Sequence, residues 1–191
     1  MVEHRMITLD ELQSREESNP KIVQRSRMEG AVIRDFARKA NLTTYIDFGC
    51  WVGLLAQQAL HGNDFERAIL VDAVGACLRK TSTKIDAGVR AEYHQVAIVA
   101  DTETRAFRMP GYDTSCAGFG QDGMPISVSQ VEVCSFLRSL KVDLARTYLK
   151  IDLEGLDLKV ASRLQQADLL PRVLHIEFAG QEGSGEKKNQ Q

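Results

Sequence analysis

The chain has 191 residues, of which 43% are hydrophobic and 26% charged, and its formal net charge is -2. This composition is typical of a globular protein with one domain and a sizeable core. It lacks the excess of Lys and Arg that binding to nucleic acid or to an anionic membrane surface requires. We therefore expect no nucleic-acid or membrane partner, and instead a small molecule or another protein.

The cysteines and the N-terminus indicate a cellular compartment. The four cysteines lie far apart without metal-type spacing, which predicts free thiols: Cys50, Cys77, Cys116 and Cys134. The N-terminus is charged from Glu3 onward and has no apolar core of a signal peptide. No run approaches the roughly 20 apolar residues of a membrane span. These features predict a protein of the reducing cytoplasm.

The ends of the chain differ from its middle. Residues 1–19 are polar and are expected to form an N-terminal arm, and the polar, glycine-containing residues 181–191 are expected to be a disordered tail. We expect a single domain over 20–180. Its first element is an amphipathic helix from Pro20 to about Ala40, whose basic polar face is either solvated or grips an acidic substrate.

After this helix, short apolar runs alternate with helical patterns. Strands are expected at 43–49, 67–73, 92–100, 147–155 and 172–180, helices at 52–62, 74–88 and 156–167, and a strand running into a short helix at 127–140. This alternation predicts an α/β, Rossmann-like fold with a mostly parallel central sheet and helices on both faces. A further strand at 104–109 is expected to pair back onto the third strand. The loop at 110–125 is either a lid over a ligand or a plain crossover.

The first two strand ends suggest a ligand site, because ligands bind beyond the carboxyl ends of parallel strands. Asp47, Gly49 and Gly53 lead directly into a helix, and these glycines either let the backbone approach a ligand or pack the helix close to the strand. The helix N-terminus would offer free N–H groups to anionic oxygens. Asp72 ends the second strand, where an acidic residue commonly accepts hydrogen bonds from ribose hydroxyls. Because G-x-G-x-x-G is absent, we expect an adenosine-containing ligand other than a nicotinamide dinucleotide.

The stretch "YLKIDLEG" at 148–155 contains three charged residues within a strand that we expect at the centre of the sheet. Unpaired buried charges cost several kcal/mol, so Lys150, Asp152 and Glu154 must pair, bind a ligand or lie at the mouth of a cleft. Glu177 ends the following strand. We expect the carboxylates at the cleft and Lys150 as their internal counter-charge.

Six segments in this order resemble the FkbM-type family of S-adenosylmethionine-dependent methyltransferases: "YIDFGCWVG", "ILVDAVG", "QVAIVADTETRAF", "VEVCSFL", "LKIDLEG" and "LHIEF". The resemblance covers about residues 43–178. It implies a class I methyltransferase fold and an enzyme that O-methylates a sugar or another small metabolite. It further implies three groups of site residues: Asp47, Gly49 and Gly53 at the methionine part of the cofactor, Asp72 at the ribose, and Asp152 and Glu154 at the methyl-transfer end.

Two features depart from the family pattern. Cys50 and Trp51 replace the usual Ala and Asn of the cofactor loop, and Trp51 either stacks on the cofactor or fills its pocket. Class I methyltransferases normally end in an antiparallel hairpin, whereas only a polar tail follows Phe178. We expect the hairpin to be missing, and an uncovered sheet edge favours pairing with another chain, which predicts a homodimer.

For the reaction, the candidate bases are Asp152, Glu154 and His94, although a single strand histidine is also a common core residue. A divalent metal held by Asp152 with Glu154 or Glu177 could orient the acceptor hydroxyl. The alternative is a catalytically degenerate methyltransferase-fold protein that serves as a ligand-binding or protein-interaction module.

Overall fold

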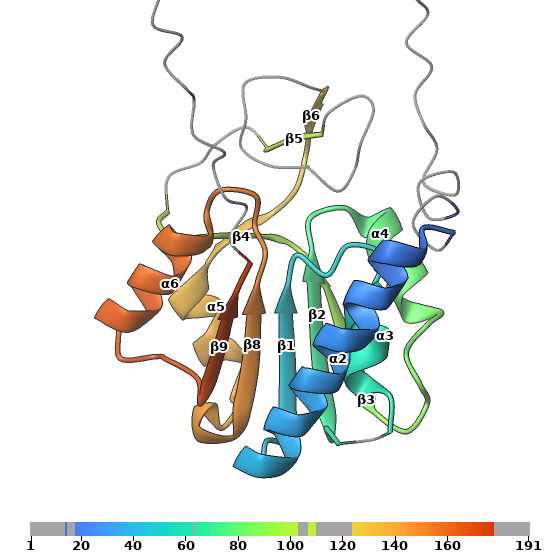
Figure 1. Ribbon diagram of the computed structural model, residues 1–191. Helices are drawn as coiled ribbons and strands as arrows, with labels where there is room; N and C mark the ends of the chain where they lie inside the picture. Colours follow the sequence, from blue (N-terminus) through green and yellow to red (C-terminus); the bar gives the residue numbers. More distant parts are fainter. Residues whose placement is uncertain (1–13, 15–17, 63, 103–106, 110–123, 178–191) are drawn as a thin grey trace, which may run out of the picture.

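The computed structural model describes residues 14, 18–62, 64–102, 107–109 and 124–177. Most of the expected arm at 1–19, most of the expected loop at 110–125 and the whole expected tail at 181–191 lie outside these residues. The described residues form one layered α/β unit (Figure 1).

A five-stranded parallel sheet forms the centre of the fold (Figure 1). Its strands, in spatial order, are β3 (Arg90–Gln95), β2 (Arg67–Asp72), β1 (Thr44–Phe48), β8 (Thr147–Ile151) and β9 (Val173–Ile176). Together with helices on both faces, this confirms the expected fold class of a mostly parallel Rossmann-like sheet. Within the described residues no strand pairs with the outer edge of β9.

The two central strands are buried along their whole length, and their alternating side chains reach two separate cores. On one face, Tyr45 stacks against Tyr148 with ring centroids 5.9 Å apart. On the other face, Phe48 and Ile151 pack into the second core. Burial on both faces explains why the runs in the sequence read as nearly continuous apolar segments.

Three helices cover the first face: α2 (Pro20–Ala40), α3 (Leu54–Leu60) and α4 (Gly75–Ser82). Two cover the other face: α5 (Val133–Leu140) and α6 (Asp157–Gln166) (Figure 1). The side chain of Asn19 caps α2, and Pro20 occupies its first turn, where a missing N–H costs nothing. A Cβ on Gly30 would collide with Gln58, so this glycine allows α2 to lie close to α3.

Two expectations about the middle of the chain are wrong. The expected strand at 92–100 divides at Val96: β3 remains at the edge of the main sheet, while β4 (Ala97–Val99) pairs with β7 (Gln130–Glu132) in a separate parallel pair. The division buries Ile98 in the second core, whereas β3 stays half-exposed. The segment at 104–109 contributes β5 (Phe107–Met109), which pairs antiparallel with β6 (Met124–Ile126) and not with the third strand.

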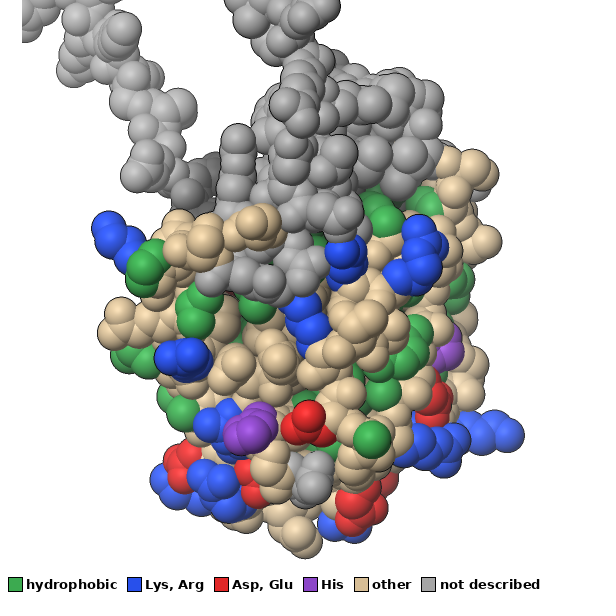
Figure 2. All heavy atoms as spheres, turned by 90° about the vertical axis from the view of Figure 1, so that its right-hand side faces the viewer, with side chains coloured by type: hydrophobic (Ala, Val, Ile, Leu, Met, Phe, Trp, Pro, Cys, Tyr) green, Lys and Arg blue, Asp and Glu red, His purple; other side chains and the backbone are tan. Residues whose placement is uncertain are grey.

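No helix among the described residues is both long and apolar enough to span a bilayer. The side of the molecule that carries β3 and α4 shows Lys, Arg, Asp and Glu side chains intermixed over its lower half (Figure 2). The charges over this lower half therefore form no extended patch of one sign.

Candidate functional site

The sheet changes direction between β1 and β8. From β1 the chain proceeds outward to β2 and β3, and it later returns to add β8 and β9 on the other side. The loops that follow β1 and β8 therefore diverge and open a crevice at the carboxyl ends of these strands, which is the usual ligand position in such sheets. Gly49 follows β1 and Asp152 follows β8.

The loop that follows β1 is held by the chain's own acceptors. The amides of Gly49 and Cys50 donate to the carbonyl of Val71, and the amide of Trp51 donates to the Asp72 carboxylate at 2.8 Å. The carbonyl of Trp51 accepts from the Thr81 hydroxyl at 2.7 Å, while its backbone is left-handed at φ +44°. These three amides of the loop are therefore already bonded within the chain. Free N–H groups were expected at the N-terminus of the following helix, α3, which is only seven residues long and has no side-chain cap; that expectation stays a prediction.

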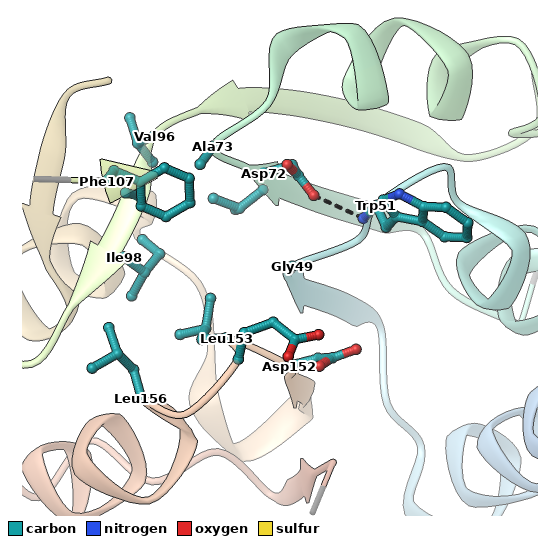
Figure 3. Close-up of a pocket in the computed structure, with 13 residues that line it drawn as sticks. Gly49, Trp51, Asp72, Ala73, Val96, Ile98, Phe107, Asp152, Leu153 and Leu156 are labelled. Atoms are coloured by element: carbon teal, nitrogen blue, oxygen red, sulfur yellow. Dashed lines mark hydrogen bonds between the residues drawn. The ribbon is translucent and has the colours of Figure 1, made fainter. Parts of the chain in front are cut away.

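An apolar pocket opens beside this loop (Figure 3). Its apolar end is lined by Val96, Ile98, Phe107, Leu153 and Leu156, and its acidic end by Asp72, Asp152 and Glu154. The ring of Phe107 and the side chain of Ile98 lie on the opposite side of the pocket from Trp51, whose indole points away from the pocket centre (Figure 3). The pocket thus offers a flat apolar wall at one end and hydrogen-bond acceptors at the other.

Asp72 is poised to titrate near neutral pH. Its Oδ2 accepts from the Trp51 amide and its Oδ1 from the Val74 amide, each at 2.8 Å. Burial raises the pKa of Asp72 to about 6, although these two amide hydrogen bonds partly oppose the rise. Each carboxylate oxygen keeps acceptor capacity beyond its one amide partner.

A second cavity, the charged pocket, lies on the α2 side of the crevice. Its lining includes six ionisable side chains from four elements and the segments that follow them: Arg25 and Glu29 on α2, Asp47 on β1, Lys150 and Asp152 at β8, and Glu177 after β9. Gly49, Trp51 and Asp152 line both pockets. The two cavities therefore meet at the point where β1 and β8 end.

Lys150 is the centre of the charged pocket and is only 3% exposed. Its Nζ lies 3.0 Å from Asp152, 3.5 Å from Asp47 and 3.8 Å from Glu177. Burial by itself would lower the pKa of Lys150, but the three carboxylates outweigh it and raise that pKa. The side chain therefore stays an ammonium, and its expected role as internal counter-charge is confirmed.

Asp47 has a buried oxygen without a hydrogen-bond donor. The side chain is 1% exposed, and its Oδ2 accepts from the Tyr45 hydroxyl at 2.9 Å. Its Oδ1 has no hydrogen-bond partner among the described residues; the Lys150 ammonium lies at ion-pair distance only. A buried acceptor normally has a donor, so Asp47 offers a place for a donor group of a ligand.

The pKa values of the two carboxylates at the rim, Asp152 and Glu177, shift in opposite directions. Burial, together with the neighbouring Glu177, raises the pKa of Asp152, although the nearby Lys150 opposes the rise. For Glu177, burial is outweighed by Asp152, Lys150 and Arg25, which together lower its pKa. The Arg25 guanidinium donates to Glu177 at 2.6 Å and to Glu29 at 2.7 Å. Glu177 is therefore the more firmly ionised member of the pair.

The structure brings together six of the eight residues expected in the site: Asp47, Gly49, Trp51, Asp72, Asp152 and Glu154. Gly53 lines neither pocket; it has φ +75° and packs against Thr81. His94 also lines neither pocket, because its ring packs edge-on against Phe136 at 5.3 Å. Glu154 is exposed, since β8 ends at Ile151 and the following turn has φ +46° at Glu154.

Other site residues had weak signals in the sequence. Arg25 was one of several basic residues on the predicted helix, and nothing in the spacing singled it out. Val96, Ile98 and Phe107 belong to segments whose strand pairing could not be derived from their pattern.

No group of three or more His, Cys, Asp or Glu side chains is arranged for a metal ion within the described ranges. Asp152 and Glu177, the carboxylates nearest the junction of the pockets, share the Lys150 ammonium.

Comparison with known proteins returned no similarity: no family model, curated protein or solved structure matches the chain.

Proposed function

We propose that the protein is an S-adenosylmethionine-dependent methyltransferase that methylates a hydroxyl group of a sugar or another small metabolite. The observation that carries this proposal is the character of the crevice. The apolar pocket and the charged pocket meet at the ends of β1 and β8, and the amides of Gly49, Cys50 and Trp51 are already bonded within the chain.

This character favours a cationic nucleoside over a nucleotide. A phosphate ligand needs free amides or cations, and carboxylates near it would repel it. Here Asp47, Asp72 and Asp152 lie at or beside the crevice, and the nearest cation, Lys150, is held by carboxylates. S-adenosylmethionine contains no phosphate and carries positive charge on its sulfur and its amino group, so the residues fit it better than they fit a dinucleotide.

Each part of this cofactor has a suitable environment. Ile98, Phe107 and Leu156 offer an apolar surface for the adenine, and Asp72 offers acceptors for the ribose hydroxyls. Asp47 Oδ1, a buried acceptor without a donor, suits the amino group of the methionine part. When bound, the cofactor supplies a methyl group on a positively charged sulfur.

The chain's own contribution to the reaction would be positioning and proton acceptance. Asp152 lies at the junction of the two pockets and Glu177 lies beside it, so either carboxylate can accept the proton of the acceptor hydroxyl. Lys150 holds both in place through its ion pairs. A divalent metal is left out of this proposal because these two carboxylates already share the Lys150 ammonium.

We also place the protein in the cytoplasm, with a small-molecule acceptor as its partner. Cys50, Cys77 and Cys134 are buried thiols that form no disulfide among the described residues, which supports a reducing compartment.

A second candidate is a degenerate relative that binds a ligand or a protein without catalysis. Both oxygens of Asp72 bind the backbone of neighbouring loops, and this structural role would explain the residue even without a ribose. Trp51, whose backbone is left-handed, also stands where the family pattern has Asn.

Calorimetry with S-adenosylmethionine and its demethylated product separates these functions. We expect micromolar binding by the wild type and at least a tenfold loss in Asp72→Ala, with Asp86→Ala, an exposed acid away from both pockets, as the control. No heat at millimolar ligand would overturn the methyltransferase proposal. Binding without any transfer to a panel of hydroxylated metabolites would favour the degenerate module. If Asp152→Asn and Glu177→Gln both kept full turnover, neither carboxylate would be the base.

A further inference from the structure

The apolar pocket and the charged pocket meet at one short part of the crevice, which we call the junction. It is defined by the three residues that line both pockets: Gly49, Trp51 and Asp152. Gly49 has no side chain, and the indole of Trp51 points away from the centre of the apolar pocket (Figure 3). Of these three residues, Asp152 is therefore the one that brings a charge to the junction.

The carboxylate of Asp152 is accessible to a ligand. Its side chain is 31% exposed, whereas that of Asp47 is 1% exposed. Glu177 is about as exposed as Asp152, but it lines only the charged pocket and accepts a hydrogen bond from Arg25 at 2.6 Å. Asp152 is therefore the carboxylate that a ligand spanning both pockets would meet where it crosses from one to the other.

The charges around the junction do not balance. When all of its ionisable groups are ionised, the charged pocket has two more negative than positive charges, since it is lined by four carboxylates and two cations: Glu29, Asp47, Asp152, Glu177, Arg25 and Lys150. The apolar pocket adds Asp72 and Glu154, and none of its described lining residues is Lys or Arg. Burial and the neighbouring Glu177 raise the pKa of Asp152, so an added cation would stabilise its ionised form.

The buried side chain of Asp47 also points to a ligand that carries donor groups. It lines the charged pocket and is 1% exposed, yet its Oδ1 has no hydrogen-bond donor among the described residues. The Lys150 ammonium, 3.5 Å from this oxygen, is shared with Asp152 and Glu177. The described part of the chain therefore supplies less positive charge than these carboxylates can bind.

We propose that Asp152 recognises the positive charge on the sulfur of the cofactor, so that the protein binds S-adenosylmethionine more tightly than its demethylated product. This inference rests on the proposed function. With the ribose at Asp72 and the amino group at Asp47, the sulfur lies at the junction, because it joins the adenosyl part of the molecule to the methionine part. The carboxylate attracts the positive sulfur there, whereas the neutral sulfur of the product gains no such attraction.

This preference has a consequence for turnover. When the acceptor oxygen forms a bond to the methyl carbon, the bond between that carbon and the sulfur breaks and its electron pair stays on the sulfur. The hydroxyl proton passes to Asp152 or Glu177. The sulfur is then neutral, so the product leaves without losing an attraction between opposite charges. We therefore expect only weak inhibition by the product.

Calorimetry of the wild type with three ligands tests the preference without any mutation. S-adenosylmethionine should bind about tenfold more tightly than the demethylated product. The sulfoxide of that product has the pyramidal sulfur of the cofactor without its net charge, and it should bind no more tightly than the product. Equal affinities of cofactor and product, or a sulfoxide that binds as tightly as the cofactor, would overturn this inference and leave the proposed function intact. Failure of all three ligands to bind would overturn both.

Two carboxylates of the same turn provide matched variants. Asp152→Asn should weaken binding of S-adenosylmethionine about tenfold and change the affinity for the product by less than about threefold. Glu154→Gln also removes one negative charge, but Glu154 is exposed and lines only the apolar pocket, so the preference for the cofactor should persist. A preference that survives Asp152→Asn, or that Glu154→Gln removes equally, would show that Asp152 is not the residue that recognises the charge. Thermal unfolding of both variants checks that they are folded.

Discussion

Gly49 and Asp152 close the gap between β1 and β8: a Cβ on Gly49 would occupy the position of the Asp152 backbone carbonyl. The Asp152 amide also donates to the carbonyl of Phe48 at 2.9 Å, which fixes the two strand ends against each other. The crevice therefore begins at a point where only glycine fits. Both residues line the apolar and the charged pocket, so this contact sets the geometry of the junction.

Gly49→Ala should abolish binding of the demethylated cofactor, because the methyl group would push β1 and β8 apart. We expect an additional loss of about 2 kcal/mol or more in the free energy of unfolding, since Gly49 also has φ +83°. Gly62→Ala is the matched control: Gly62 has φ +95° but a Cβ there would meet no atom within 4 Å. It should lose only about 1 kcal/mol and keep its affinity. Equal affinities of the two variants in calorimetry would contradict this role of Gly49.

Lys150→Met should destabilise the protein by about 3 to 5 kcal/mol, because it leaves the buried Asp47 without a counter-charge. The measurement is urea unfolding at pH 7. Lys39→Met removes an exposed pair with Asp35 and should change the free energy of unfolding by less than about 1 kcal/mol. Adding Asp47→Asn to Lys150→Met should restore part of the loss. A loss below about 1 kcal/mol in Lys150→Met would mean that the charged pocket is well hydrated.

Binding of the demethylated cofactor should weaken as pH falls through the pKa of Asp72, about 6. The ribose needs the ionised carboxylate as acceptor, so the affinity should fall about tenfold between pH 7 and pH 5. The stability of the free protein should also depend on pH, in the opposite direction. Because the pKa of Asp72 is higher in the folded than in the unfolded state, its contribution to the free energy of unfolding should fall as pH rises from about 4 to 6. In Asp72→Asn the pH dependence of both quantities should be reduced; an unchanged pH profile would assign the effect to another group.

Trp51 is the only tryptophan in the chain and lines both pockets. Its fluorescence should therefore change when the demethylated cofactor binds. Trp51→Gly should relieve the left-handed backbone and keep the affinity within about threefold, because the loop is bound to Asp72 through the backbone amide. A tenfold loss would show that the indole stacks on the cofactor, and a tenfold gain would show that it fills the pocket.

The periodicity of the sequence determined the layers of the fold. The regular spacing of apolar residues predicted α2 from Pro20 to Ala40, and the apolar runs predicted the strands of the central sheet. The positions of Asp47, Gly49, Asp72 and Asp152 at strand ends followed from the same pattern, because parallel strands all end at one edge. Lys150 could also be placed among carboxylates, since a charge in a central strand requires partners.

Only the tertiary structure decided how distant segments meet. It divided the third strand at Val96, brought Phe107 to the apolar pocket and brought Arg25 to Glu177, 152 positions away in the chain. In the structure His94 also packs against Phe136, and Glu154 is exposed to solvent. The periodicity of apolar residues shows which face of an element is buried. It does not show which other segment covers that face, because that depends on packing between segments far apart in the sequence. The sequence by itself therefore determined the type and order of most elements, while packing decided where the third strand divides and which side chains share the two pockets.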